Sequence, residues 1–278
     1  MTFTTQIKEE ITKEENNNIE DLTSLCTYLK FNATLEEDKM TVMVVNASVA
    51  RWIFKLLKTN YNVLIKLTTR TMKRFKARNL YILEVKEKLD LIYKDIDNIF
   101  KEINTSSDEE KKAFLKGMFL ACGSINDPKK NQYHLEFLVK EEEDAKLIDD
   151  LLNSLKIKSK VLKRDREYMV YVKSSENISD FIKYLGAFNA LFYFEDIRIY
   201  KDHKNMVNRL NNCEQANVER TLKSSKTILD NIKYLEDNDL LMLLDDRSKE
   251  IIEYKKKYPD TSLGELAEII TMETNKSI

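Results

Sequence analysis

Phe114-Leu-Lys-Gly-Met-Phe-Leu-Ala-Cys-Gly-Ser-Ile125 is the stretch that decides the fold of this 278-residue sequence. Its apolar residues predict that it forms the later turns of a helix over Asp108–Cys122. Ala113, Gly117 and Ala121 recur every four residues, so they form one stripe of small side chains along that helix. Another helix backbone can approach closely at such a stripe, although ordinary packing of the helix on a sheet would use it equally well.

The same stretch resembles the signature helix of the LAGLIDADG homing endonucleases. In that family the helix ends in acidic residues, and the second acid binds the catalytic metal. Here Cys122 stands at the position of that acid, immediately before Gly123. The resemblance therefore implies a nuclease-shaped DNA-binding scaffold from which the chemistry has been lost.

An internal repeat organises the first two thirds of the chain. Leu29-Lys-Phe-Asn-Ala-Thr-Leu35 matches the signature stretch, and Leu80-Tyr-Ile-Leu-Glu-Val85 matches Glu167-Tyr-Met-Val-Tyr-Val172, both at a spacing of about 90 residues. Helical and alternating apolar patterns follow the same order in both halves. In the first half they predict helices at 21–32 and 48–59 and strands at 40–45, 61–68 and 80–85. In the second half they predict helices at 108–122, 141–155 and 174–185 and strands at 133–139, 157–162 and 168–172.

This order resembles the αββαββα plan of a single-chain LAGLIDADG fold, in which the two signature helices meet between the halves. We therefore predict an α+β protein with a duplicated LAGLIDADG-like αββαββα domain at residues 1–200. Its half-repeats are expected at about 20–105 and 106–195. An all-α, helix-turn-helix-like domain is predicted at 201–278.

The charges of the chain are nearly balanced overall but unevenly distributed. There are 46 Lys and Arg residues against 47 Asp and Glu, a formal net charge of −1. The segment from Lys55 to Lys88 nevertheless holds ten basic residues against two acidic ones, and that from Lys156 to Lys173 holds seven against two. Segregated basic stretches can form one electropositive face on a neutral protein. The alternative is a solvated, lysine-rich surface.

The two basic stretches occupy equivalent places in the two halves, which favours a shared role. In the LAGLIDADG fold the strands form a saddle along DNA, so basic residues on outward strand positions and strand-joining loops would contact phosphates. Double-stranded DNA is therefore the expected partner. The candidate DNA-binding residues are Arg70, Lys73, Arg74, Lys76, Arg78, Lys163, Arg164 and Arg166.

Catalysis is not expected from this sequence. One carboxylate from each signature helix holds the metal in the nucleases, and the equivalent positions here are Asn32 and Cys122. Neither supplies the hard anionic oxygen that magnesium prefers. We therefore predict no catalytic residue and no metal, and the sequence suggests no cofactor or small-molecule substrate.

Several other classes of protein are disfavoured. The three cysteines and two histidines show no metal-ligand spacing or catalytic pattern, and scattered cysteines fit reduced thiols in a cytosol. No apolar run reaches the roughly 18–20 residues that span a bilayer, and the N-terminus lacks the apolar core of a signal peptide. A cytoplasmic protein without a membrane partner is expected.

A second motif lies beyond the repeat. Asn-Arg-x-x-Asn-Cys-Glu-x-Ala-Asn at 208–217, together with the signature stretch and its continuation to Pro128, resembles the WhiA family of bacterial regulators. That resemblance implies a nucleoid-associated, DNA-binding transcriptional regulator in cell division and chromosome segregation, with possible protein partners. The alternative is a protein-interaction scaffold in cell division that has little DNA affinity.

The C-terminal region is expected to resemble a helix-turn-helix domain. A helix at 247–258 and a turn at 259–261 precede Ser262 and Glu265, which form a predicted capping box that opens a second helix to about 270. A turn at 271–275 should then lead into the recognition helix. The sequence ends at Ile278, so we expect this recognition helix to be incomplete.

Overall fold

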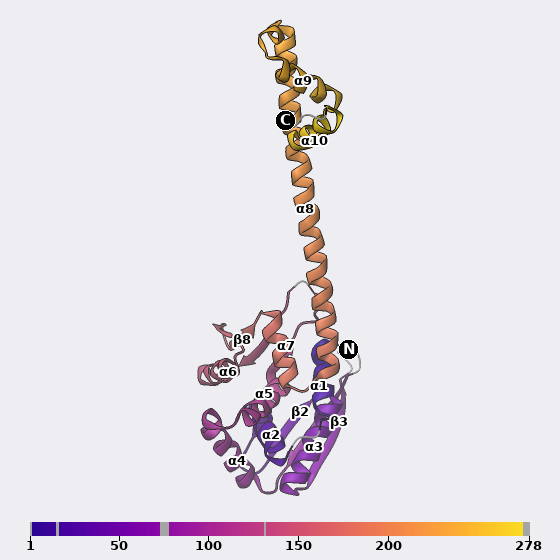
Figure 1. Ribbon diagram of the computed structural model, residues 1–278. Coiled ribbons are helices and arrows are strands. Elements are labelled where there is room, and N and C mark those ends of the chain that lie inside the picture. The colour runs from indigo at the N-terminus through magenta and orange to yellow at the C-terminus, as the bar shows by residue number, and fades with distance from the viewer. Residues whose placement is uncertain (1, 15–16, 73–77, 131, 275–278) are drawn as a thin grey trace. The chain divides into compact units, whose positions relative to one another are not determined.

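The computed structural model describes residues 2–14, 17–72, 78–130 and 132–274 (Figure 1). The chain forms two compact units, Met1–Ile199 and Tyr200–Ile278. The boundary falls within one long helix, α8 (Phe188–Asp237), and the two units are described separately below.

The first unit repeats one order of elements twice. The first half contains α2 (Asn18–Asn32), β1 (Ala33–Leu35), β2 (Met40–Val44), α3 (Ala47–Tyr61), β3 (Ile65–Met72), β4 (Arg78–Val85) and α4 (Leu89–Glu102). The second half contains α5 (Asp108–Cys122), β5 (Gly123–Ile125), β6 (Leu135–Val139), α6 (Glu142–Ser154), β7 (Lys160–Lys163), β8 (Tyr168–Val172) and α7 (Ser175–Tyr184). A short 3-10 turn, Ile103–Thr105, joins them.

The two sheets have the same topology. Their strand orders are β1-β2-β4-β3 and β5-β6-β8-β7, and all the neighbouring pairs are antiparallel. In the order of the sequence, α3 and α6 each lie between the first two strands of their half and the hairpin formed by its last two strands. The predicted duplicated αββαββα order is therefore confirmed.

The helices α2 and α5 pack directly against each other, and Gly117 of the small-residue stripe lies at their contact. A Cβ atom on Gly117 would collide with the carbonyl oxygen of Ser24 and lie 2.8 Å from the Cβ of Thr27. Ser24 and Thr27 are fully buried in α2. The stripe is thus used for helix-on-helix packing, which decides between the two interpretations that the sequence left open.

One face of each sheet packs against helices. In the second half, Phe137 and Val170 are fully buried on that face, and the ring of Phe119 lies 5.7 Å from that of Phe181. In the first half the equivalent positions include the buried Val42 and Leu83. The opposite face of each sheet turns away from these helices, and we call it the open face.

The helix α1 (Phe3–Ile11) was not predicted from the sequence. Phe3, Ile7 and Ile11 share one face and are buried. The hydroxyl of Thr4 donates to the carbonyl oxygen of Ile125 at 2.8 Å and accepts from its N–H at 3.0 Å, which ties α1 to the edge of β5. Because α1 also packs on α3, it connects the two halves.

The N-terminal helix also holds the first turn of α8. The carboxylate of Glu10 accepts from the N–H groups of Asn189 and Ala190 at 2.7 and 3.1 Å. These are among the N–H groups that a helix leaves without an internal acceptor at its start. Glu10 therefore acts as a cap supplied by a distant segment, which also explains why no local signal marks this helix start.

Two predicted boundaries are corrected. The strand expected from 61 begins at Ile65, because Tyr61 ends α3 and Asn62 takes a left-handed conformation with φ 47°. The loop expected between the strands at 61–68 and 80–85 is shorter, because Arg70 belongs to β3 and the backbone of Arg78 to β4.

The second unit contains the remainder of α8, a 3-10 turn (Leu240–Leu243), α9 (Asp246–Lys257) and α10 (Leu263–Thr274). The predicted capping box is confirmed, since the Glu265 N–H donates to the Ser262 hydroxyl and the Glu265 carboxylate accepts from the Ser262 N–H. The turn predicted from 271 is wrong as far as Thr274, because α10 continues to that residue. The segment expected to begin the recognition helix lies outside the described residues.

A buried lysine stabilises the junction of these helices. The ammonium of Lys255 donates to the Ser225 hydroxyl at 2.8 Å and to the carbonyl oxygens of Pro259 and Thr261. A buried ammonium is tolerated because its three donors are satisfied. Among the described residues, no helix combines the length and the apolar character needed to cross a membrane.

Candidate nucleic-acid interface

The outer strand of each sheet carries a lysine and an arginine on the open face. In the first half, Lys66 pairs with Glu84 and Arg70 with Leu80 in the β3–β4 register. These residues alternate with the helix-facing positions, so Lys66 and Arg70 lie on the same face of the strand. Arg70 is exposed, and Lys66 forms an ion pair of 3.2 Å with Glu84.

The second half repeats this arrangement at equivalent positions. Lys160 pairs with Tyr171 in the β7–β8 register, and the Arg164 N–H donates to the carbonyl oxygen of Glu167 at 2.8 Å. Since 80–85 matches 167–172 in the internal repeat, Lys160 corresponds to Lys66 and Arg164 to Arg70. Both Lys160 and Arg164 are exposed.

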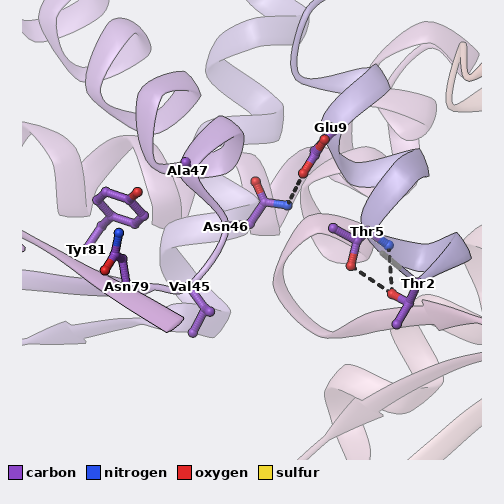
Figure 2. Close-up of a pocket in the computed structure, with 8 residues that line it drawn as sticks. All are labelled: Thr2, Thr5, Glu9, Val45, Asn46, Ala47, Asn79 and Tyr81. Atoms are coloured by element: carbon purple, nitrogen blue, oxygen red, sulfur yellow. Dashed lines mark hydrogen bonds between the residues drawn. The ribbon is translucent and has the colours of Figure 1, made fainter. Parts of the chain in front are cut away.

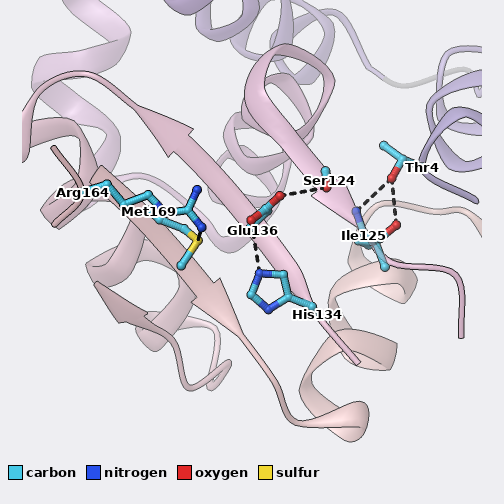
Figure 3. A network of polar contacts seen from close by, with 7 residues as sticks. All are labelled: Thr4, Ser124, Ile125, His134, Glu136, Arg164 and Met169. Carbon is cyan, nitrogen blue, oxygen red and sulfur yellow. Dashed lines mark hydrogen bonds and ion pairs between the residues drawn. The ribbon is translucent and has the colours of Figure 1, made fainter. Parts of the chain in front are cut away.

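Arg164, Glu136 and His134 lie on the open face of the second sheet (Figure 3). The Arg164 guanidinium donates to the Met169 sulfur at 3.0 Å, which holds it against the sheet. The imidazole of His134 lies 3.2 Å from the Glu136 carboxylate and stacks 5.9 Å from the ring of Tyr171. This face therefore combines a guanidinium, an imidazole and an aromatic ring, groups that bind phosphates and bases.

The structure separates the predicted basic residues into several groups. Arg166 lies exposed in the β7–β8 turn. Lys163 lies on the opposite face of β7 from Arg164, where its ammonium is 5.6 Å from the Tyr168 ring. Arg78 pairs with Met72 through its backbone. The candidates outside the described residues are Lys73, Arg74 and Lys76.

Sequence reasoning missed part of this surface. His134, Lys160, Tyr171 and Lys173 all belong to the open face or its rim, and the Lys173 ammonium lies 5.1 Å from the Tyr171 ring. Side chains of a strand point alternately to its two faces, and this alternation along β6 and β8 was the signal that could have found these residues. It marks Glu136 and Tyr171 as facing away from the core.

The C-terminal ends of α2 and α5 carry the residues that replace the nuclease acids. The Asn32 amide donates to the Tyr28 hydroxyl, and the Cys122 thiol donates to the carbonyl oxygen of Met118 at 3.4 Å. Burial raises the pKa of Cys122 to about 12, so the thiol is protonated at neutral pH. The ammonium of Lys8 from α1 donates to the carbonyl oxygen of Leu120 at 3.0 Å.

This set of donors does not fit a hard divalent cation. Magnesium is usually bound through one or two carboxylates, whereas the side chains at these helix ends are an amide, a neutral thiol and a nearby ammonium. Among the described residues there is also no cluster of three acidic, histidine or cysteine side chains that could hold a metal.

A cleft of about 740 Å³ lies between one side of α1 and the segment that joins β2 to α3 (Figure 2). Its polar groups serve the fold. The side-chain oxygen of Asn46 accepts from the N–H groups of Ser48 and Val49 at the start of α3, and its amide donates to Glu9 at 3.5 Å. We therefore interpret the cleft as the seam where α1 meets the first half.

Three family models match the chain in order. They are the WhiA N-terminal LAGLIDADG-like domain at residues 19–99, the WhiA LAGLIDADG-like domain at 111–204 and the WhiA C-terminal HTH domain at 207–278. A relative from Oceanobacillus iheyensis, named a probable cell division protein WhiA, is 36% identical over 98% of this chain and 90% of its own length. A relative of the same name from Bacillus cytotoxicus is 37% identical over the same shares.

Solved structures show the same fold. The full-length DUF199/WhiA from Thermatoga maritima superposes with a TM-score of 0.64 at 21% identity, covering 98% of this chain and 92% of that one. An N-terminal LAGLIDADG domain of DUF199/WhiA gives 0.54 at 22% identity, covering 66% and 92%. Fold and matches together define a two-half LAGLIDADG-like protein with a C-terminal helix-turn-helix domain. The chain belongs to the WhiA family.

Proposed function

We propose that this chain is a non-catalytic DNA-binding protein of the WhiA type, which regulates transcription in cell division and chromosome segregation. Its expected partner is double-stranded DNA in the nucleoid. Protein partners in transcription or division would act through other surfaces. The role in division is taken from the names of its relatives.

The equivalent lysine–arginine pairs on the outer strands carry this proposal. Lys66 and Arg70 in one half match Lys160 and Arg164 in the other. Two residues four apart on one face of a strand are separated by about 13 Å, which lets each pair contact different phosphates. Paired basic edges on two similar sheets suit a duplex, whose phosphates are regularly repeated. The HTH family match at 207–278 supports the same partner.

Loss of cleavage follows from the ends of the signature helices. Asn32, Cys122 and Lys8 supply no metal-binding carboxylate there. Supercoiled plasmid incubated with magnesium or manganese should therefore stay intact. Nicking that disappears in Asn32→Ala or Cys122→Ala would overturn this part of the proposal.

One observation favours the rival function, a protein-interaction scaffold. Met206 and Leu210 are exposed by 54% or more on one side of α8 in the second unit, and exposed apolar side chains that lie together are typical of protein interfaces. The rival predicts little affinity for DNA.

Fluorescence anisotropy with a labelled duplex tests the proposal against this rival. Affinity should fall steeply between about 50 and 200 mM salt, because bound cations are released from the phosphates. Arg70→Ala/Arg164→Ala should weaken binding and reduce the slope of log K against log salt by about 2.

The matched control is Lys58→Ala/Lys163→Ala, which also removes one positive charge from each half. Lys58 is an exposed residue of α3, and Lys163 lies on the far face of β7. This variant should bind DNA nearly as well as the unmodified chain. Absence of binding by the unmodified chain even at about 50 mM salt would refute DNA binding.

A further inference from the structure

One side of α8 in the second unit is lined by amides. At 3.6 residues per turn, five amide side chains point within about 60° of the direction of Asn208 around the helix axis. They are Asn205, Asn208 itself, Asn211, Asn212 and Gln215. All five are exposed. We call this surface the amide face. Asparagine is a poor helix former, so this composition weakens the helix and needs another explanation.

These amides are available to an external partner. Gln215 donates to Glu219 at 3.1 Å. For the side chains of Asn205, Asn208, Asn211 and Asn212, the structure gives no hydrogen bond to another described residue. Each asparagine side chain therefore presents one acceptor and one amino group outward.

Lysines flank the amide face at both ends. Lys204 precedes the amides, and Lys223 and Lys226 follow them on the same side of the helix. All three are exposed. Glu219 is the acidic residue on this side between positions 204 and 226, and it is held by Gln215. The face is thus positive at its ends and neutral, with many hydrogen-bonding groups, in its middle.

The helices of the second unit leave this face open. Ser225 and Ile232 are the buried residues of α8 in that unit, and Ser225 receives the ammonium of Lys255 from α9. By helical geometry both point about 100–120° away from the direction of Asn208. The packing side and the amide face of α8 are therefore different sides of one helix.

We propose that the amide face of α8 reads base edges in the major groove of duplex DNA. The groove is about 12 Å wide and admits an α-helix, and asparagine or glutamine pairs in a bidentate way with adenine. Asn205 to Gln215 spans about 15 Å along the helix, which is the length of about four base pairs. The flanking lysines would contact phosphates on either side of the groove and orient the helix. This inference rests on the proposed DNA binding but concerns a surface separate from the two sheets.

Selection from a pool of duplexes with a randomised centre tests this proposal with the full chain. The unmodified protein should enrich a short, adenine-containing sequence. Asn208→Ala/Asn212→Ala should bind the unselected pool within about twofold of the unmodified chain but lose roughly tenfold in preference for the selected sequence. Alanine favours the helix, so circular dichroism should show an intact fold.

The matched control is His203→Ala/Asn217→Ala, which changes two exposed polar residues on the other side of α8. It should keep the sequence preference. Lys223→Ala/Lys226→Ala should weaken binding to all duplexes equally and lower the salt slope.

The outcomes separate this inference from the proposed function. If the unmodified chain binds no duplex, DNA binding itself fails. If it binds but enriches no sequence, or if Asn208→Ala/Asn212→Ala keeps the same preference, the amide face does not read bases, while DNA binding stands.

Discussion

The two halves of the LAGLIDADG-like unit share a topology but differ in their open faces. Both open faces carry an apolar cross-strand pair, Met43 and Ile82 in the first half and Leu138 and Met169 in the second. They differ beside that pair, because Glu84 forms an ion pair with Lys66 in the first half, whereas the equivalent Tyr171 lies opposite the exposed Lys160 in the second. The helix-facing sides remain apolar in both. Packing positions have thus kept their character while the surface has diverged, which suggests that the second half contributes more to DNA binding.

The signature helices differ in a complementary way. α5 has no side chain at Gly117, and the small residues Ser24 and Thr27 of α2 pack against that position. The end of α5 is covered by Lys8, whereas the Asn32 amide at the end of α2 bonds to Tyr28 within the same helix. The interface is therefore asymmetric, and each side can be changed separately.

Gly117→Ala should have the largest effect on the structure. Its Cβ would overlap the Ser24 carbonyl oxygen, which is backbone and cannot rotate away. We expect a loss of about 3 kcal/mol in the free energy of unfolding, as is typical of overpacking. Urea denaturation followed by circular dichroism measures it.

Gly264→Ala is the control for this prediction. Gly264 lies in α10, and the nearest atom to its added Cβ is 4.0 Å away. The same substitution should there stabilise the helix by up to about 1 kcal/mol. Equal effects at both positions would show that close approach of α2 and α5 is not what requires glycine.

The unequal open faces predict unequal effects on DNA binding. Lys160→Ala/Arg164→Ala should weaken duplex binding about tenfold, or about 1.4 kcal/mol. Lys66→Ala/Arg70→Ala should weaken it only about threefold, because Glu84 already neutralises Lys66. Anisotropy titrations at one salt concentration compare the two variants, which remove the same charge. A larger loss from the first half would reverse the assignment of roles.

Local signals were sufficient for much of this fold. The bounds of α5 agree with the prediction because the Ser107–Glu110 capping box marks its start and Gly123 follows its end. The strand at 168–172 agrees for the same kind of reason, since alternation is a short-range pattern. The order of elements followed from the repeat.

The remaining features depend on long-range packing. α1 is only nine residues long and would be marginal in isolation, so its helix depends on contacts with β5 and α3. The orientation of the basic residues depends on strand register, because neighbouring residues point to opposite faces. Arg164 and Lys163 are adjacent in sequence yet lie on different faces of the sheet, and no loop-based reasoning distinguishes them.

The side-chain caps at the starts of α2 and α5 should contribute equally to the free energy of unfolding. The side chain of Asn17 accepts from the Glu20 N–H at 2.8 Å, and the Ser107 hydroxyl accepts from the Glu110 N–H at 3.3 Å. Asn17→Ala and Ser107→Ala should each cost about 1 kcal/mol of stability. The double variant should lose about the sum in urea denaturation, since the two caps share no partner. A much smaller cost for one variant would mean that its half frays without loss of the core.

The ammonium of Lys8 lies at the end of α5, the second signature helix. Replacing Lys8 should change the free energy of unfolding least among these variants, and the change should depend on pH. Burial lowers the pKa of Lys8 to about 8 in the folded chain, while an unfolded lysine has its ordinary value of about 10.4. Between these values the unfolded state binds more protons, so this residue makes stability rise with pH from about 8 to about 10.4. Below pH 8 the cost of burying the charge is fully present. Lys8→Met should therefore remove that rise, which urea denaturation at pH 7.5, 9 and 10 would reveal as a difference from the unmodified chain.

Lys13→Met, at an exposed position nearby, controls for the lost positive charge and should leave the rise in place. If Lys8→Met keeps the full rise as well, the ammonium is solvated and does not cover the end of α5.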